Sequence, residues 1–313
     1  MKLLILGAGA VGGYFGGRLQ QAGTDVTFLV RPVRAQLLRD NGLKIVSPKG
    51  DATLQVKVVS DATEGGPYDL AILSCKAYDL DSAVDTLAPG IGADTAIVPL
   101  LNGMKHLDVL DARFGAERVL GGVARISSGL AADGTVVHMV PLAALLTGER
   151  EKGKAPRPAL QDFAAAVGAS GFDGGVQSDI VQDMWDKWVM LCALAALTGS
   201  LRGPVCDILE TDEGSDLILE AIEECRKVAR AAGHEPGAGA MDGVRTYLTT
   251  RGSKFAASIL RDLENSFRVE AEHVIGDMIA RARSAGIATP VLRQAYVHMQ
   301  TYEQRQKREA TAT

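Results

Sequence analysis

Short apolar runs alternate with amphipathic stretches through the first half of the chain. The runs at 3–6, 26–30, 69–75 and 95–100 are typical of buried strands, because each is short and almost free of polar residues. Helical periodicity follows two of them, at 79–87 and 106–114. Strands that alternate with helices in this way predict a parallel, doubly wound sheet.

Other segments of the first half also have β-type patterns. The runs at 42–47 and 53–59 flank the turn sequence Ser47-Pro48-Lys49-Gly50 and predict a hairpin-like insertion. Apolar or alternating runs at 119–124, 134–140 and 143–147 are separated by glycine turns. We expect these later runs to be extra strands that complete the sheet.

The pattern changes to helical periodicity from about residue 178. Long amphipathic or apolar stretches cover 183–197, 215–232, 241–250 and 269–285, and Gly203-Pro204 and Pro236-Gly237 interrupt them. The polar residues 305–313 are expected to fray. The second half is therefore predicted to be an all-helical domain, residues 178–313, that follows a first domain of residues 1–177.

A glycine motif directly follows the first predicted strand. It consists of Gly7, Ala8, Gly9, Ala10, Val11 and Gly12. In a dinucleotide-binding loop the first glycine allows a tight turn, the second lets the backbone approach a pyrophosphate, and the third lets the helix pack closely on the strand. A plain turn is the alternative, but the strand before the motif and the second strand after it favour a Rossmann-like N-terminal domain.

Arg31 ends the second predicted strand, where an NAD-specific site would carry Asp or Glu. A carboxylate there binds the ribose 2′-hydroxyl, whereas a guanidinium pairs with a 2′-phosphate. The motif and Arg31 together predict an NADPH/NADP+ site. A solvated loop charge remains the alternative for Arg31.

Composition excludes several classes of function. The chain is 47% hydrophobic and 23% charged, with a net charge of -5 and a pI near 5.6, so neither nucleic acid nor a membrane surface is expected as a partner. Its four cysteines are scattered without a CxxC pair, which predicts reduced thiols in a cytoplasm and no metal site. The sequence has no apolar run long enough for a membrane span.

Five polar residues are candidates for chemistry. They are Lys76 and Asn102, which follow predicted strands, Lys187, which lies between Trp185 and Trp188, and the pair Ser258 and Glu270. A lysine that is partly removed from water can act as a proton donor near neutral pH. The alternatives are a loop lysine, an Asn-Gly turn, a lysine covering an apolar helix face, and two exposed helix residues.

Taken together, these positions resemble the ketopantoate reductases (2-dehydropantoate 2-reductases), and the resemblance spans nearly the whole chain. It includes the glycine motif with Arg31, the segment Asn102-Gly103-Met104, the Trp-x-Lys motif at residues 185–187, and a Ser-Asp-Glu pattern formed by Ser258, Asp262 and Glu270. The resemblance implies that NADPH reduces ketopantoate while Lys187 donates a proton. It also implies that Lys76 and Asn102 bind the cofactor, and that Asn102, Ser258 and Glu270 orient the keto acid.

The chain departs from the family pattern at two positions. Leu191 and Ala195 stand one and two helical turns after Lys187, where family members commonly have asparagines. This leaves two alternatives open: reduction of a different branched 2-keto acid, or an NADPH-binding sensor without catalysis. The apolar faces of the C-terminal helices fit either packing within the domain or a homodimer.

Overall fold

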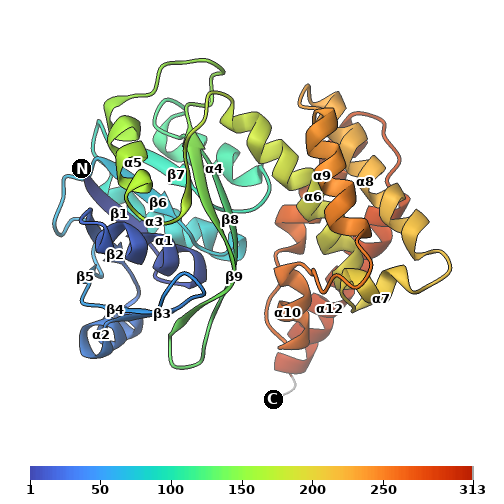
Figure 1. The fold of residues 1–313 in the computed structure, drawn as a ribbon, viewed down its shortest axis with the longest axis horizontal. Helices are drawn as coiled ribbons and strands as arrows, with labels where there is room; N and C mark the ends of the chain where they lie inside the picture. The colour runs from blue at the N-terminus through green and yellow to red at the C-terminus, as the bar shows by residue number, and fades with distance from the viewer. Residues whose placement is uncertain (312–313) are drawn as a thin grey trace. The chain divides into compact units, whose positions relative to one another are not determined.

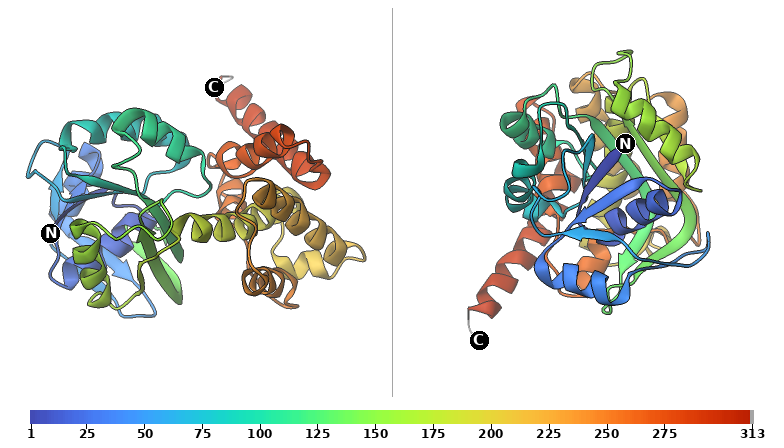
Figure 2. Two further views of the ribbon diagram at one scale, coloured as in Figure 1. Left: turned by 90° about the horizontal axis from the view of Figure 1, so that it is seen from above. Right: turned by 90° about the vertical axis from the view of Figure 1, so that its left-hand side faces the viewer.

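The computed structural model describes residues 1–311 and divides into two compact units. The first unit comprises residues 1–101 and 106–181, and the second comprises residues 102–105 and the chain from Gln182 onward. All strands belong to the first unit, and the second is built from helices (Figures 1 and 2). The predicted class, an α/β N-terminal part followed by a helical C-terminal part, is confirmed.

The first sheet is parallel and has the order β5-β2-β1-β6-β7. Its strands are β1 (Lys2–Leu6), β2 (Asp25–Leu29), β5 (Lys57–Val59), β6 (Leu70–Leu73) and β7 (Ala96–Pro99). The helical segments between and after them are α1 (Ala10–Gln21), α2 (Pro32–Asn41), η1 (Ala77–Asp79), α3 (Leu80–Leu87), η2 (Ala88–Gly90) and α4 (Lys105–Phe114). The chain order of the strands reverses at the boundary between β1 and β6. In open α/β sheets, ligands bind outside the carboxyl ends of the strands at such a boundary.

The runs predicted from residue 119 onward form β8 (Gly121–Leu130) and β9 (Val136–Gly148) of a second sheet, so the prediction that they complete the first sheet is wrong for these two strands. Val119, just before β8, does bridge to Ile97 of β7 in the first sheet. The other strands of the second sheet are β3 (Leu43–Val46), β4 (Ala52–Leu54) and β10 (Asp173–Val176). The strand β9 pairs with β8, β3 and β10. The hairpin β3-β4 is antiparallel as expected, but the predicted run 53–59 splits, because β5 pairs with β2 in the first sheet. Helix α5 (Pro158–Gly168) precedes β10 and contacts it.

Helix α1 lies between the two sheets, and its glycines let both approach. A Cβ on Gly16 would come within 2.4 Å of Ile5 Cδ1 in the first sheet. A Cβ on Gly17 would come within 2.7 Å of Ile45 Cδ1 in the second. Because packed interiors tolerate no such overlap, Gly16 and Gly17 allow α1 to pack closely against both sheets.

The second unit is arranged around a long apolar helix, α6 (Ile180–Leu201), whose residues from Cys192 to Leu197 are at most 3% exposed. The other helices are α7 (Val205–Leu209), α8 (Gly214–Ala231), α9 (Ala238–Thr249), α10 (Ser258–Glu264), the π-helical turn η3 (Glu272–Gly276), α11 (Asp277–Ser284) and α12 (Pro290–Ala310). The expected fraying is wrong for residues 305–310, since α12 continues with an Arg305–Glu309 ion pair of 2.7 Å. Residues 312 and 313 lie outside the described residues.

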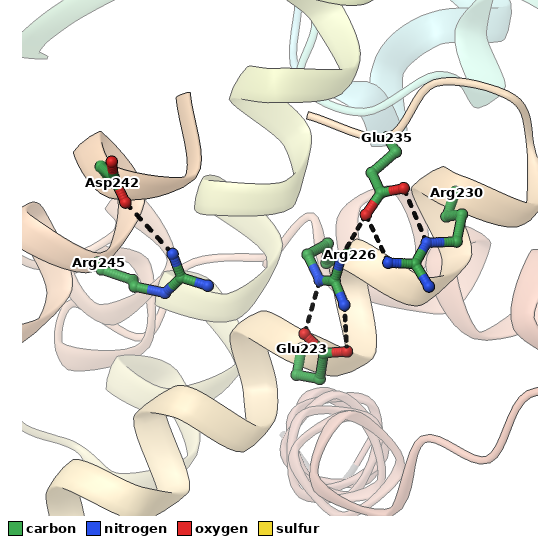
Figure 3. A network of polar contacts seen from close by, with 6 residues as sticks. All are labelled: Glu223, Arg226, Arg230, Glu235, Asp242 and Arg245. Atoms are coloured by element: carbon green, nitrogen blue, oxygen red, sulfur yellow. Dashed lines mark hydrogen bonds and ion pairs between the residues drawn. The ribbon is translucent and has the colours of Figure 1, made fainter. Parts of the chain in front are cut away.

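A network of ion pairs ties the end of α8 to the loop before α9 (Figure 3). Arg226 pairs with Glu223 at 2.6 Å and with Glu235, and Arg230 pairs with Glu235 at 2.7 Å. The neighbouring His234 stacks on Trp185 of α6 at a centroid distance of 5.7 Å. The network therefore fixes a loop that packs against the helix carrying Lys187.

Candidate active site

The three glycines of the motif occupy three different environments. Gly7 has a φ of +98°, which a residue with a side chain rarely adopts. A Cβ on Gly12 would lie 2.2 Å from the carbonyl oxygen of Gly7, so this glycine permits close packing of α1. A Cβ on Gly9, at the N-cap of α1, would meet nothing within 4 Å. The open backbone at Gly9 fits the approach of a dinucleotide pyrophosphate to a helix N-terminus.

Two residues not singled out from the sequence hold this loop. The Ser74 hydroxyl, after β6, donates to the carbonyls of Leu6 at 2.9 Å and Gly7 at 3.1 Å. The Arg34 guanidinium donates to the carbonyls of Ala8 at 2.8 Å and Gly134 at 2.9 Å. Burial lowers the pKa of Arg34. The position of Arg34 after β2 was the only sequence signal for this role, and it does not separate a structural arginine from a ligand-binding one.

Arg31 and Lys76 follow β2 and β6 of the first sheet. The Arg31 side chain is 77% exposed, and its Nη2 lies 3.1 Å from Oδ2 of Asp79. Lys76 is half-buried and precedes the short helix η1 that ends with Asp79. Arg31 is thus more exposed than Arg34, the next arginine after β2.

A pocket in the second unit brings together three of the predicted residues. Its lining consists of Asn102, Leu191, Ala195, Ala257, Ser258, Ile259, Glu270 and Val274. Ser258 begins α10, and the chain reverses after it at Ser266, whose φ is +57°. This reversal places Glu270, only 9% exposed, beside Ser258.

Lys187 reaches the same pocket through Asn102. Its Nζ donates to Asn102 Oδ1 at 2.9 Å, although the two residues are 85 positions apart in the sequence. Lys187 is half-buried on α6 and Asn102 lines the pocket. An amide oxygen that accepts from the ammonium fixes the direction in which Nζ points.

The π-helical turn η3 supports the loop that carries Asn102. Gly103 has a φ of +79°, and a Cβ on it would lie 2.8 Å from the carbonyl oxygen of His273. The Trp188 indole donates to the carbonyl of Val274 at 2.9 Å, and Lys105 pairs with Glu272 at 2.8 Å. An ordinary Asn-Gly turn was the alternative that the sequence left open for Asn102, and the pattern did not reveal these supports, which depend on residues far along the chain.

The pocket wall is largely apolar. Leu191 and Ala195 lie on the same face of α6 as Lys187, because they follow it by four and eight residues. Ile259 and Val274 complete this wall, while Asn102, Ser258 and Glu270 supply the polar groups. The lining therefore combines three polar side chains with an apolar wall.

The described residues, 1–311, contain neither a metal-binding cluster nor a helix that could span a membrane. In this part of the chain no group of three or more His, Cys, Asp or Glu side chains is placed to hold a metal ion. Nor does any described helix combine the length and the apolar character of a membrane span.

Comparison with known proteins gives the family. The model of the family "Ketopantoate reductase PanE/ApbA" matches residues 3–151, and the model of its C-terminal part matches residues 179–303. The uncharacterized oxidoreductase YkpB of Bacillus subtilis (strain 168) is 36% identical over 97% of this chain and 99% of its own length.

Solved structures agree with this match. The PanE/ApbA family ketopantoate reductase from Ralstonia eutropha JMP134 superposes with a TM-score of 0.88 at 26% identity, covering 98% of this chain and all of that one. A ternary structure of D-mandelate dehydrogenase with NADH and anilino(oxo)acetate has the same fold, with a TM-score of 0.86 at 21% identity over 98% and 100% of the two chains. This chain therefore belongs to the ketopantoate reductase family, whose members are oxidoreductases that act on CH–OH groups of small molecules with a nicotinamide cofactor.

Proposed function

We propose that this protein is a 2-dehydropantoate 2-reductase, which reduces ketopantoate to pantoate with NADPH as a step of pantothenate biosynthesis. The observation that carries the proposal is the hydrogen bond between Lys187 Nζ and Asn102 Oδ1, next to a pocket that also contains Ser258 and Glu270. A proton donor, an amide that orients it and two further polar groups converge on one small pocket, as carbonyl reduction requires.

The residues of the first unit fit the cofactor. The glycine loop presents open backbone at Gly9 for the pyrophosphate, and Arg31 supplies a cation for the 2′-phosphate. Lys76, which follows β6 of the same unit, is a further cofactor contact in this proposal. Bound NADPH supplies the hydride that the reduction needs.

In the second unit Lys187 would donate its proton to the ketone oxygen as that oxygen becomes an alkoxide. The ammonium interacts most strongly with the oxygen when its charge has developed, so it stabilises the transition state more than the substrate. Asn102 holds Nζ in position through its 2.9 Å hydrogen bond. The Ser258 hydroxyl and the Glu270 carboxylate would orient the keto acid, with Glu270 accepting from its hydroxyl group.

The test is NADPH oxidation by the purified protein on addition of ketopantoate. We expect Lys187→Ala to lower kcat by about a hundredfold or more, while the Kd for NADPH stays within about twofold. Lys227→Ala is the matched control, because Lys227 is an exposed lysine on α8 of the same unit. Normal turnover by Lys187→Ala would refute the assigned role, and tight NADPH binding without turnover of any keto acid would favour the sensor.

A second candidate, reduction of a different branched 2-keto acid, is favoured by Leu191 and Ala195 in the pocket wall. The D-mandelate dehydrogenase of the same fold holds anilino(oxo)acetate, an oxo acid with a bulky apolar group. A panel of ketopantoate, 2-oxoisovalerate and benzoylformate separates the candidates by kcat/KM. If the second is right, Leu191→Asn with Ala195→Asn should shift the preference toward ketopantoate by about tenfold, since a new polar contact then meets the hydroxyl.

A further inference from the structure

A carboxylate stands directly beside the guanidinium that the proposed function assigns to the 2′-phosphate. Asp79 Oδ2 lies 3.1 Å from Arg31 Nη2, although the two residues are 48 positions apart. Arg31 follows β2, and Asp79 ends η1 behind β6. The pair joins two loops at the carboxyl ends of strands on either side of β1.

The surroundings make Arg31 the cation that a phosphate would use. Arg34 is half-buried and bonded to the carbonyls of Ala8 and Gly134, so moving it would release the glycine loop. Arg31 is 77% exposed, while Asp79 is 32% exposed. A 2′-phosphate that binds Arg31 must therefore compete with Asp79 for the same guanidinium and approach a negative charge.

We propose that Asp79 is a cofactor-selectivity residue, which lowers the preference of this protein for the phosphorylated cofactor by pairing with Arg31. The inference rests on the proposed NADPH-dependent function and concerns the same site. Asp79 acts through Arg31 and needs no contact with the nicotinamide or the substrate. In consequence the ratio of NADPH affinity to NADH affinity should be lower than in a protein whose arginine has no acidic neighbour.

The size of the effect follows from the exposure of the pair. Exposed ion pairs contribute the equivalent of about two- to fivefold in an equilibrium constant. Removing the carboxylate also removes its repulsion of a phosphate that carries a charge of about -1.5 to -2. We therefore expect Asp79→Asn to strengthen binding of a 2′-phosphate by about three- to tenfold at low ionic strength, and by less at high salt because the charges are screened.

Calorimetric titration with adenosine 2′,5′-bisphosphate and with 5′-AMP measures this without catalysis. Asp79→Asn should tighten binding of the bisphosphate by about three- to tenfold and leave 5′-AMP within about twofold. Asp81→Asn is the matched control, since Asp81 is exposed in the first turn of α3 and makes the same change in net charge. Titrations with NADPH and NADH on the same variants should show the same change in selectivity.

The outcomes separate the inference from the proposed function. The proposed function stands if the unmodified protein binds NADPH and Arg31→Ala weakens that binding about tenfold or more. If, in that case, Asp79→Asn binds the bisphosphate no more tightly than Asp81→Asn does, the inference about Asp79 is wrong. An equal change for bisphosphate and 5′-AMP in Asp79→Asn would show a structural role and also overturn it. If the unmodified protein binds neither NADPH nor NADH, both fall together.

Discussion

Acid should destabilise the second unit through His273, a buried histidine in the π-helical turn η3. Its side chain lies against the loop of Gly103, and the residue is 7% exposed. Burial lowers the pKa of His273 to about 4, the charge of Lys105 acts in the same direction, and Glu272 opposes them. His273 is therefore neutral in the folded protein well below the pH at which an unfolded chain protonates it.

The magnitude follows from the two pKa values. The ordinary value is 6.5 and the folded value about 4, a difference of about 2.5, and each pKa unit corresponds to about 1.36 kcal/mol. The stabilising contribution is complete above about pH 6.5 and is lost as the pH falls toward 4, because only the unfolded chain takes up the proton in that window. The free energy of unfolding should fall by about 2 kcal/mol between about pH 7.5 and pH 5 from this residue alone.

Urea denaturation followed by far-UV circular dichroism at the two pH values measures this loss. His273→Gln removes the titrating group, so its unfolding free energy should depend on pH less than that of the unmodified protein, by about 2 kcal/mol. His298→Gln is the control for the effect of a histidine-to-glutamine change, because His298 is exposed on α12. Equal pH dependence in His273→Gln and the unmodified protein would refute the reasoning.

Further predictions concern two glycines of the motif and a buried glutamate. Gly9→Ala should leave the free energy of unfolding within about 0.5 kcal/mol and weaken NADPH binding, because its Cβ meets nothing within 4 Å but occupies the expected pyrophosphate approach. Gly12→Ala should cost about 1–3 kcal/mol, since its Cβ would lie 2.2 Å from the Gly7 carbonyl oxygen; thermal denaturation and NADPH titration of both variants check this, and equal stabilities would contradict it. Glu224 is 6% exposed and accepts hydrogen bonds of 3.0 Å from the amides of Val291 and Leu292, so it caps α12. Glu224→Ala should lower the free energy of unfolding by about 1–3 kcal/mol in urea denaturation. The control Glu220→Ala should cause no measurable loss, because Glu220 is exposed on α8.

Four strands of the first sheet, β1, β2, β6 and β7, could be predicted from the sequence because they carry their signal locally. Each of the four is a short apolar run before a turn and a helix, and the glycine motif marks the end of β1. The second sheet could not, because its order depends on pairing between distant segments. The parallel pairing of β3 with β9 joins Ile45 to Val136, and β4 and β5 belong to different sheets although only two residues separate them.

The candidate site divides in the same way. Lys187, Asn102, Ser258 and Glu270 stood out by residue type, position and family resemblance, but the pattern did not show that Lys187 bonds to Asn102. Side-chain contacts over such sequence separations depend on the tertiary packing of α6, α10 and η3. For the same reason the sequence could not predict that Arg31 pairs with Asp79, or that Arg34 donates hydrogen bonds to backbone carbonyls.

The structure separates what is costly to change in this protein from what is easy to change. The glycine loop depends on backbone shape, and a side chain at Gly12 would meet backbone atoms. The Lys187–Asn102 bond needs a particular donor and a particular acceptor. Leu191 and Ala195, by contrast, line the pocket wall and take no part in that bond, so under the proposed function substrate choice can vary while the reaction chemistry stays. The family therefore constrains the type of reaction more strongly than the keto acid, and the substrate panel with the asparagine variants is the experiment that addresses the difference.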